Sequence, residues 1–316
     1  MKNQLNFLGL IKNDKKALII VVLFQIHFAY SQVNYCGNCG IFKNDNLELY
    51  KNISNIEFRE YKGSPIFEDL DEDSKLQLLE ETQTVTYNDF GKVEEYASNG
   101  LFSISYKFTY NEIGEIVGLI ENEVIEHKET FNYDKEKNEV KQYIYDYDGV
   151  NIDRIIVYKL NRKGQTLNEK EFNGSGGVLR EHSFKYDDKG NEIFSIQYGV
   201  KATTTCKYDE QGRIISKYTT NNYGKGFTTT FKYNLNGKII EQIGKSDQTG
   251  LSYKIIYEYD NNLMISEKRI DYSNGKERST EAKKYFYDNR RMWIKEITTR
   301  NDILALICMR VINYKN

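Results

Sequence analysis

The sequence Tyr-Asp-Glu-Gln-Gly-Arg-Ile-Ile, residues 208–215, carries the signal that decides the fold. An Asp or Asn after the Tyr can bond its own backbone two residues further on, and the Gly supplies the positive φ that closes a tight loop. A loop of three to five residues that contains a Gly joins two antiparallel strands. This stretch therefore predicts the turn of a β-hairpin.

The same pattern recurs at intervals of 22–28 residues. Its nine copies begin at Tyr87, Tyr110, Tyr133, Leu160, Tyr186, Tyr208, Tyr233, Tyr259 and Tyr287, and the turn glycines of the best-kept copies are Gly91, Gly114, Gly190, Gly212 and Gly237. We interpret these tyrosines and glycines as structural anchors of a repeat. A second set of turn signals lies between the copies. The repeat predicts an all-β meander of about nineteen antiparallel strands.

Period-two alternation identifies one apolar face on these strands, as in Phe102, Ile104, Tyr106 and Phe108. Two residues before each copy lies a mostly aromatic column, which consists of Phe108, Phe131, Tyr158, Phe184, Cys206, Phe231, Tyr257 and Tyr285. Open sheets rarely exceed about ten strands without curling. We therefore expect a curled sheet with the column inward, its Ser/Thr/Lys/Glu face in solvent, and any binding site along the turn edges or in an open mouth.

These copies resemble the YD repeat of the RHS proteins, a family with related repeats in teneurins and in the shells of bacterial toxin complexes. The resemblance covers about residues 83–314 and implies a chain of β-hairpins that forms a long, twisted, curled sheet or an open shell. Full RHS toxin carriers end in a Pro-containing boundary motif followed by a toxin domain. This chain has no Pro after Pro65, so the resemblance is to a short, free-standing repeat protein without a toxin domain.

The first 31 residues have the pattern of an export signal. Lys12, Lys15 and Lys16 precede the apolar run 17–29, which is shorter than the roughly 20 residues that a spanning helix needs. We expect a signal peptide over 1–31, a capping segment over 32–82 that covers an open sheet edge, and repeats over 83–316. The protein would then be periplasmic, surface-bound or extracellular. An uncleaved signal anchor is the alternative, and it would be the only contact with a membrane.

Cys36 and Cys39 form a Cys-x-x-Cys motif in the expected capping segment. We favour a local disulfide, with free thiols, metal binding and redox chemistry as alternatives. A closed zinc site needs four ligands, and no second such motif exists. Cys206 and Cys308 occupy apolar strand positions, which favours small buried side chains. No cofactor is expected.

The sequence contains no catalytic constellation. His127 and His182 lie in predicted strands without a nucleophile beside them, and we interpret both as exposed strand histidines. The acidic run 68–73 lacks the spacing of a calcium-binding EF-hand loop, and a solvated loop is the better interpretation. We therefore expect a protein that is not an enzyme.

The formal net charge of −2 gives no reason to expect nucleic acid as a partner. The 26 tyrosines suit contact with a carbohydrate or a cell-surface protein, since their rings give amphipathic contact area. The leading expectation is an exported binding or adhesion protein. A structural envelope component and a remnant of an RHS-type toxin-carrier shell are alternatives. An outer-membrane barrel is disfavoured because strands such as residues 92–95 lack a lipid-facing apolar band.

Overall fold

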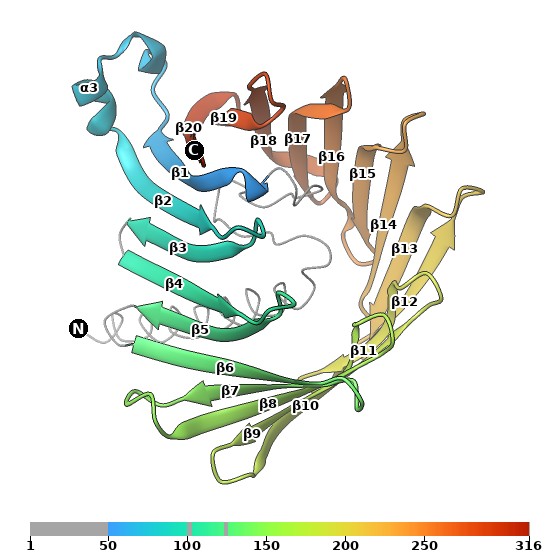
Figure 1. The fold of residues 1–316 in the computed structure, drawn as a ribbon. Coiled ribbons are helices and arrows are strands. Elements are labelled where there is room, and N and C mark those ends of the chain that lie inside the picture. Colours follow the sequence, from blue (N-terminus) through green and yellow to red (C-terminus); the bar gives the residue numbers. More distant parts are fainter. Residues whose placement is uncertain (1–49, 100–102, 123–125, 316) are drawn as a thin grey trace, which may run out of the picture.

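The computed structural model describes residues 50–99, 103–122 and 126–315. These residues form twenty strands, a 3-10 helix η1 (Phe67–Asp69) and a short helix α3 (Glu72–Leu76) (Figure 1). In chain order the strands are β1 (Ile53–Lys62), β2 (Leu79–Tyr87), β3 (Val93–Asn99), β4 (Ser103–Tyr110), β5 (Ile116–Asn122), β6 (Glu126–Asp134), β7 (Glu139–Tyr145), β8 (Ile152–Leu160), β9 (Thr166–Asn173), β10 (Val178–Tyr186), β11 (Glu192–Gln197), β12 (Val200–Tyr208), β13 (Ile214–Asn221), β14 (Gly226–Tyr233), β15 (Ile239–Ser246), β16 (Gly250–Asp260), β17 (Leu263–Ser273), β18 (Lys276–Tyr287), β19 (Trp293–Arg300) and β20 (Ile303–Tyr314).

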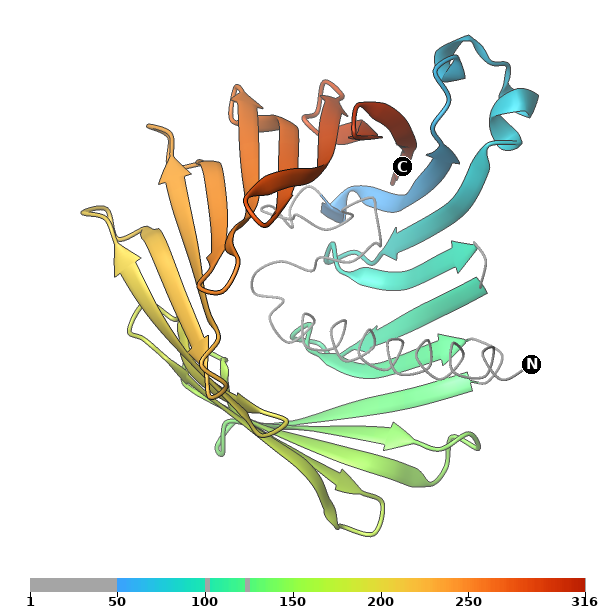
Figure 2. The same cartoon turned by 180° about the vertical axis from the view of Figure 1, so that it is seen from behind.

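Each strand pairs antiparallel with the next strand in the chain, and β20 pairs with β1. Figures 1 and 2 both show β20 returning to lie beside β1. At this seam Ile56 lies opposite Ile312, and Phe58 lies opposite Arg310. The sheet is therefore a closed twenty-stranded meander barrel.

Closure corrects the expectation of an open sheet or shell. The all-β antiparallel architecture is confirmed, but the segment expected to cap an open edge contains β1, which is paired on both sides. A free sheet edge exposes unpaired backbone donors and acceptors. Pairing the 10-residue β1 with the 12-residue β20 satisfies both edges at once.

Hydrogen bonds within the anchor turns fix where one strand ends and the next begins. In the copy at Tyr208, Asp209 Oδ1 accepts a hydrogen bond from the Arg213 backbone N–H at 2.8 Å, and the Gly212 N–H donates to the Asp209 carbonyl at 2.9 Å. Gly212 has a φ of 79°. Arg291 takes the same left-handed conformation, with a φ of 64°, in one of the copies that lack the glycine, where Asp288 Oδ1 accepts a hydrogen bond of 2.8 Å from the Met292 N–H. The Asx turn therefore forms even where the glycine is replaced.

Several anchor tyrosines join neighbouring hairpins through their hydroxyl groups. Each donates to a carbonyl near the start of the strand that follows the preceding turn. These bonds run from Tyr110 to Val93 (2.5 Å), Tyr186 to Thr166 (2.9 Å), Tyr233 to Ile214 (2.7 Å), Tyr259 to Ile239 (2.9 Å) and Tyr287 to Met264 (2.7 Å). A tyrosine therefore packs its ring on the sheet and satisfies its polar end in the same place.

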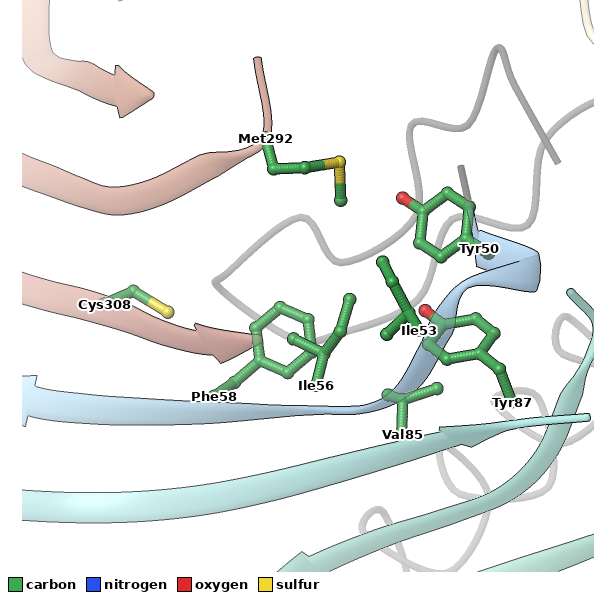
Figure 3. Close-up of a cluster of buried hydrophobic side chains, with 8 residues drawn as sticks. All are labelled: Tyr50, Ile53, Ile56, Phe58, Val85, Tyr87, Met292 and Cys308. Carbon is green, nitrogen blue, oxygen red and sulfur yellow. The ribbon is translucent and has the colours of Figure 1, made fainter. Parts of the chain in front are cut away.

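The face that carries the aromatic column is the more buried face of the sheet. One core cluster lies at the seam and consists of Tyr50, Ile53, Ile56, Phe58, Val85, Tyr87, Met292 and Cys308 (Figure 3). A second lies on β4–β8 and includes Phe108, Phe131 and Tyr158. Along the column, side chains are buried as far as Phe184 in β10 and only half-buried from Cys206 in β12 onward. The core is therefore concentrated at the seam and on β4–β10.

The cysteines differ from the expected pattern. Cys308 is fully buried but takes part in a disulfide, so it is not the simple small side chain that the sequence predicts. Cys206 is a half-buried free thiol. The predicted disulfide between Cys36 and Cys39 lies outside the described residues, as does the predicted signal peptide. Within the described ranges, no helix is long and apolar enough to cross a membrane.

Candidate functional site

The meander gives the barrel two rims of turns. The anchor rim carries the turns that follow the repeat anchors, and the opposite rim carries the turns between them. On the opposite rim, four consecutive turns lie between β7 and β14, in the green and yellow part of Figure 1. These turns and the start of β10 carry exposed large apolar side chains. This tyrosine rim consists of Tyr147, Val150, Val178, Leu179, Tyr198 and Tyr223, which are all more than half exposed.

Three of these exposed side chains are tyrosines. Tyr147 is 80% exposed, Tyr198 70% and Tyr223 66%. Successive turns on one rim are two strands apart, which is about 10 Å across the strands. Tyr147 and Tyr198 are separated by two such steps, and Tyr198 and Tyr223 by one. Exposed aromatic groups at regular positions on one rim are typical of a contact surface.

The chain holds Tyr198 in a conformation that a tyrosine rarely adopts. Tyr198 and Gly199 form the two-residue loop between β11 and β12, with φ values of 51° and 76°. Such a loop favours Asn-Gly, because both residues need a positive φ. A left-handed L-residue with a side chain costs roughly 1–2 kcal/mol. Backbone strain of this kind is more frequent at functional positions than elsewhere.

A group of charged side chains lies behind Tyr198 on the column face of β8–β10. We call it the Arg180 cluster; it consists of Arg154, Glu169, Glu171, Arg180 and His182. Strand register places His182 opposite Glu169 and Arg180 opposite Glu171. His182 Nδ1 lies 3.5 Å from Glu169 Oε1, and Arg154 Nη1 lies 3.1 Å from Glu171 Oε1. Arg180 also forms an ion pair with Glu171.

Tyr198 contacts this cluster directly. Its hydroxyl accepts a hydrogen bond of 2.9 Å from Arg180 Nη1. Its ring centroid lies 4.6 Å from that of His182 in an edge-to-face arrangement, and the Arg180 guanidinium lies 5.8 Å from the ring centroid. The exposed ring is therefore fixed from behind by two charged or titratable side chains.

Burial controls the charge of the cluster. Glu169 is 2% exposed and His182 5%, which corrects the expectation of an exposed strand histidine. Burial raises the pKa of Glu169 against the opposing effect of Arg180. Burial, followed by the charge of Arg180, lowers the pKa of His182. His182 is therefore neutral at pH 7.

Four buried polar atoms of the cluster have no hydrogen-bond partner within the described part of the chain, and one of them, Arg180 Nε, is ion-paired with Glu171. The other three are Glu169 Oε2, Arg180 Nη2 and His182 Nε2. Buried polar groups are nearly always hydrogen-bonded in native proteins, to protein or to water. Three such atoms in one cluster therefore indicate a place that takes an additional polar group.

The polar network continues along the same face toward β6. The Tyr158 hydroxyl donates to Gln142 Oε1 at 2.7 Å, and Gln142 Nε2 donates to Glu129 Oε2 at 2.7 Å. All three side chains are buried. Burial holds the pKa of Tyr158 well above its ordinary value, so its phenol keeps the donated proton. This part of the network is satisfied internally.

The anchor rim carries two grooves, each between the turns of neighbouring copies. One lies between residues 111–117 and 131–136, the other between 161–167 and 186–188. In the second, Gln165 Nε2 donates to the Gly190 carbonyl at 2.7 Å and Lys163 Nζ to the Asp188 carbonyl at 2.5 Å. In the first, Lys135 lies 3.6 Å from Glu115. Because these side chains link adjacent turns, we assign both grooves to the packing of one repeat copy on the next.

The other sequence candidates are not brought into the cluster. The acidic run 68–73 is not a simple loop, since it forms η1 and the start of α3, where Asp71 accepts a hydrogen bond of 2.7 Å from the Ser74 N–H. His127 belongs to β6, but its side chain lies outside the described residues. Across the described ranges, no group of three or more His, Cys, Asp or Glu is arranged to hold a metal ion.

Comparisons with known proteins leave the family open. No family model matches the chain, and no curated protein matches its sequence. The fold is similar to part of the crystal structure of TcdB2-TccC3-Cdc42, with 13% identity over 78% of this chain and a TM-score of 0.38; the chain spans 15% of that protein. It is also similar to a porin-like protein from Bacteroides uniformis ATCC 8492, with 15% identity, coverage of 83% and 98% of the two chains and a TM-score of 0.33. At these TM-scores neither similarity supports an argument about function.

Proposed function

We propose that the protein is an exported binding protein, not an enzyme, which holds a carbohydrate against the tyrosine rim. The observation that carries the proposal is the exposure of Tyr147, Tyr198 and Tyr223 on turns of one rim. A tyrosine ring offers an apolar face to the C–H groups of a sugar and a hydroxyl for hydrogen bonding. It does so at low entropic cost, because only two χ angles are fixed.

The arrangement of the rings favours an extended carbohydrate over a protein partner. A protein interface usually has a continuous apolar centre within a polar rim. Here the rings stand on separate turns beside polar residues such as Asp148 and Asn221, and the exposed apolar side chains at the turn between Tyr147 and Tyr198 are the aliphatic Val178 and Leu179. Spacings of about 20 Å between Tyr147 and Tyr198 and about 10 Å between Tyr198 and Tyr223 suit an extended polymer that touches one ring after another.

Export and the absence of catalysis belong to the same proposal. The lysines at 12, 15 and 16 and the apolar run 17–29 support export. The contact between His182 and Glu169 is the arrangement nearest to a catalytic dyad, but it is buried behind Tyr198. A base needs a nucleophile within its reach. We therefore assign the pair to binding. The repeat pattern, with its resemblance to YD repeats, supports a surface role.

Affinity electrophoresis of the mature chain through gels that contain soluble polysaccharides tests the proposal. We expect at least one polysaccharide to retard the wild type and not the variant Tyr147→Ala/Tyr198→Asn/Tyr223→Ala. The matched control is Phe90→Ala/Ile113→Ala/Leu235→Ala, which removes three side chains on the anchor rim that are all more than 60% exposed. Retardation of the rim variant equal to that of the wild type would overturn the proposal. Failure of a broad panel to retard the wild type would favour a structural envelope role.

A further inference from the structure

We propose that the Arg180 cluster is a subsite for one neutral, hydroxyl-bearing sugar unit, with the ring of Tyr198 as one wall. This inference rests on the proposed function and names the part of the site that selects the ligand. It starts from the three buried atoms without partners, Glu169 Oε2, Arg180 Nη2 and His182 Nε2.

The unpartnered atoms include both donors and acceptors. Arg180 Nη2 can only donate, whereas Glu169 Oε2, as a carboxylate oxygen near Arg180, accepts. His182 Nδ1 faces Glu169 Oε1 at 3.5 Å, so the proton of the neutral imidazole lies on Nδ1. His182 Nε2 is then an acceptor. The missing partner must therefore accept one hydrogen bond and donate two, which two adjacent hydroxyl groups of one sugar unit can do together.

The charge balance of the cluster argues against an ionic ligand. Arg154 and Arg180 are matched by the buried Glu169 and Glu171 through the ion pairs described above, and Arg154 also pairs with the exposed Asp153. An added anion would meet two buried carboxylates, and an added cation would meet two guanidinium groups. A neutral polyol avoids both, and its adjacent hydroxyls can reach more than one of the three unpartnered atoms.

The cluster is open on one side. The Arg180 side chain is 20% exposed and that of Arg154 28%, whereas the carboxylates behind them are almost fully buried. A ligand therefore approaches past the two arginines, alongside the exposed ring of Tyr198. The strained backbone of Tyr198 holds that ring where a sugar can stack on it.

Protonation of His182 gives the subsite a pH signature. The titratable or charged groups that face it are Glu169 and Glu171 from β9, Arg180 from β10 and the phenol of Tyr198, whereas Tyr158 on β8 lies opposite Glu169. A second proton turns Nε2 from an acceptor into a donor that competes with Arg180 for the same hydroxyl oxygen. Because burial lowers the pKa of His182 below its ordinary value of about 6.5, sugar affinity should fall as the pH decreases through that lowered pKa.

The first test uses the polysaccharide that retards the wild type. We expect Arg180→Met, which keeps most of the side chain but removes the donors, to weaken binding at least tenfold at pH 7.5. His182→Gln should weaken binding and remove the additional loss seen between pH 7.5 and 5.5. The control Arg300→Met changes an arginine on β19 whose side chain is 58% exposed. If Arg180→Met and His182→Gln bind like the wild type while the rim variant does not, the subsite is wrong and the proposed function stands.

The second test does not depend on knowing the polysaccharide. The ¹⁵N resonances of the His182 imidazole are followed during titration with glucose, galactose and N-acetylglucosamine, and assigned with His182→Gln. We expect at least one sugar to shift the Nε2 resonance in the wild type but not in Arg180→Met. If none of them moves it, water alone fills the cluster and the inference is overturned.

Discussion

Replacing Phe58 with Ala should lower the free energy of unfolding by about 4 kcal/mol. Phe58 is 1% exposed at the seam between β1 and β20, and its ring centroid lies 6.0 Å from that of Trp293 and 5.0 Å from the Arg310 guanidinium. Removing a buried phenylalanine side chain costs about 3–5 kcal/mol through lost burial and the cavity left behind. The neighbours are strands paired on both sides, which limits collapse into the cavity.

Urea unfolding of the protein measures this loss, with Phe286→Ala as the control. Phe286 is 43% exposed, so its removal should change stability by less than about 1 kcal/mol. Hydrogen exchange then locates the damage. We expect amides of β1, β2 and β20 to lose protection before those of β12–β16. A loss below about 1 kcal/mol for Phe58→Ala, or protection lost first in β12–β16, would refute the account of the seam.

Three further predictions address the turns and the Arg180 cluster. Gly212→Val should destabilise the fold by about 1–2 kcal/mol because φ at Gly212 is 79°. Gly118→Ala, at a glycine without positive φ, should have a smaller effect. Equal effects in urea unfolding would contradict the turn assignment. Tyr198→Asn should stabilise the fold by about 1 kcal/mol in the same assay while it weakens sugar binding. A loss of stability would show that the contacts of the Tyr198 ring stabilise the fold by more than its backbone strain costs. Burial lowers the pKa of His182, so the unfolded state takes up its proton first and stability falls as the pH drops through 6.5 toward the folded pKa. His182→Gln should remove that loss between pH 7.5 and 5.5. Because the raised pKa of Glu169 changes stability in the opposite direction, the chains with His182 and with His182→Gln are compared in a Glu169→Gln background. An unchanged pH profile would contradict the assignment.

The repeated hairpins could be predicted because their signal is local. Asp209 bonds to Gly212 and Arg213, which follow it by three and four residues, within one turn. Closure could not be predicted in this way, since Ile56 and Ile312 pair across almost the whole chain. The strand that contains Ile56 precedes the first repeat copy and carries no anchor. No spacing in the sequence therefore points to its partner.

The Arg180 cluster was missed for a different physical reason. Glu169 and Glu171 occupy positions that the alternation assigns to the column face, where an apolar residue is expected. A charge at such a position indicates a buried partner, and this signal could have been used. The identity of the partner depends on the register of β9 with β10, which places His182 and Arg180 opposite the two glutamates. The tyrosines of the rim likewise precede turn glycines in the sequence, but only the structure gives their exposure.

The most direct test of the central claim is the ratio of two dissociation constants for the polysaccharide that the protein binds. One is measured with Tyr147→Ala/Tyr198→Asn/Tyr223→Ala, the other with Phe90→Ala/Ile113→Ala/Leu235→Ala, both by calorimetry at pH 7.5. Removal of three stacked rings at about 1 kcal/mol each should weaken binding by two orders of magnitude or more relative to the control. A ratio near one would contradict the assignment of the tyrosine rim as the binding surface.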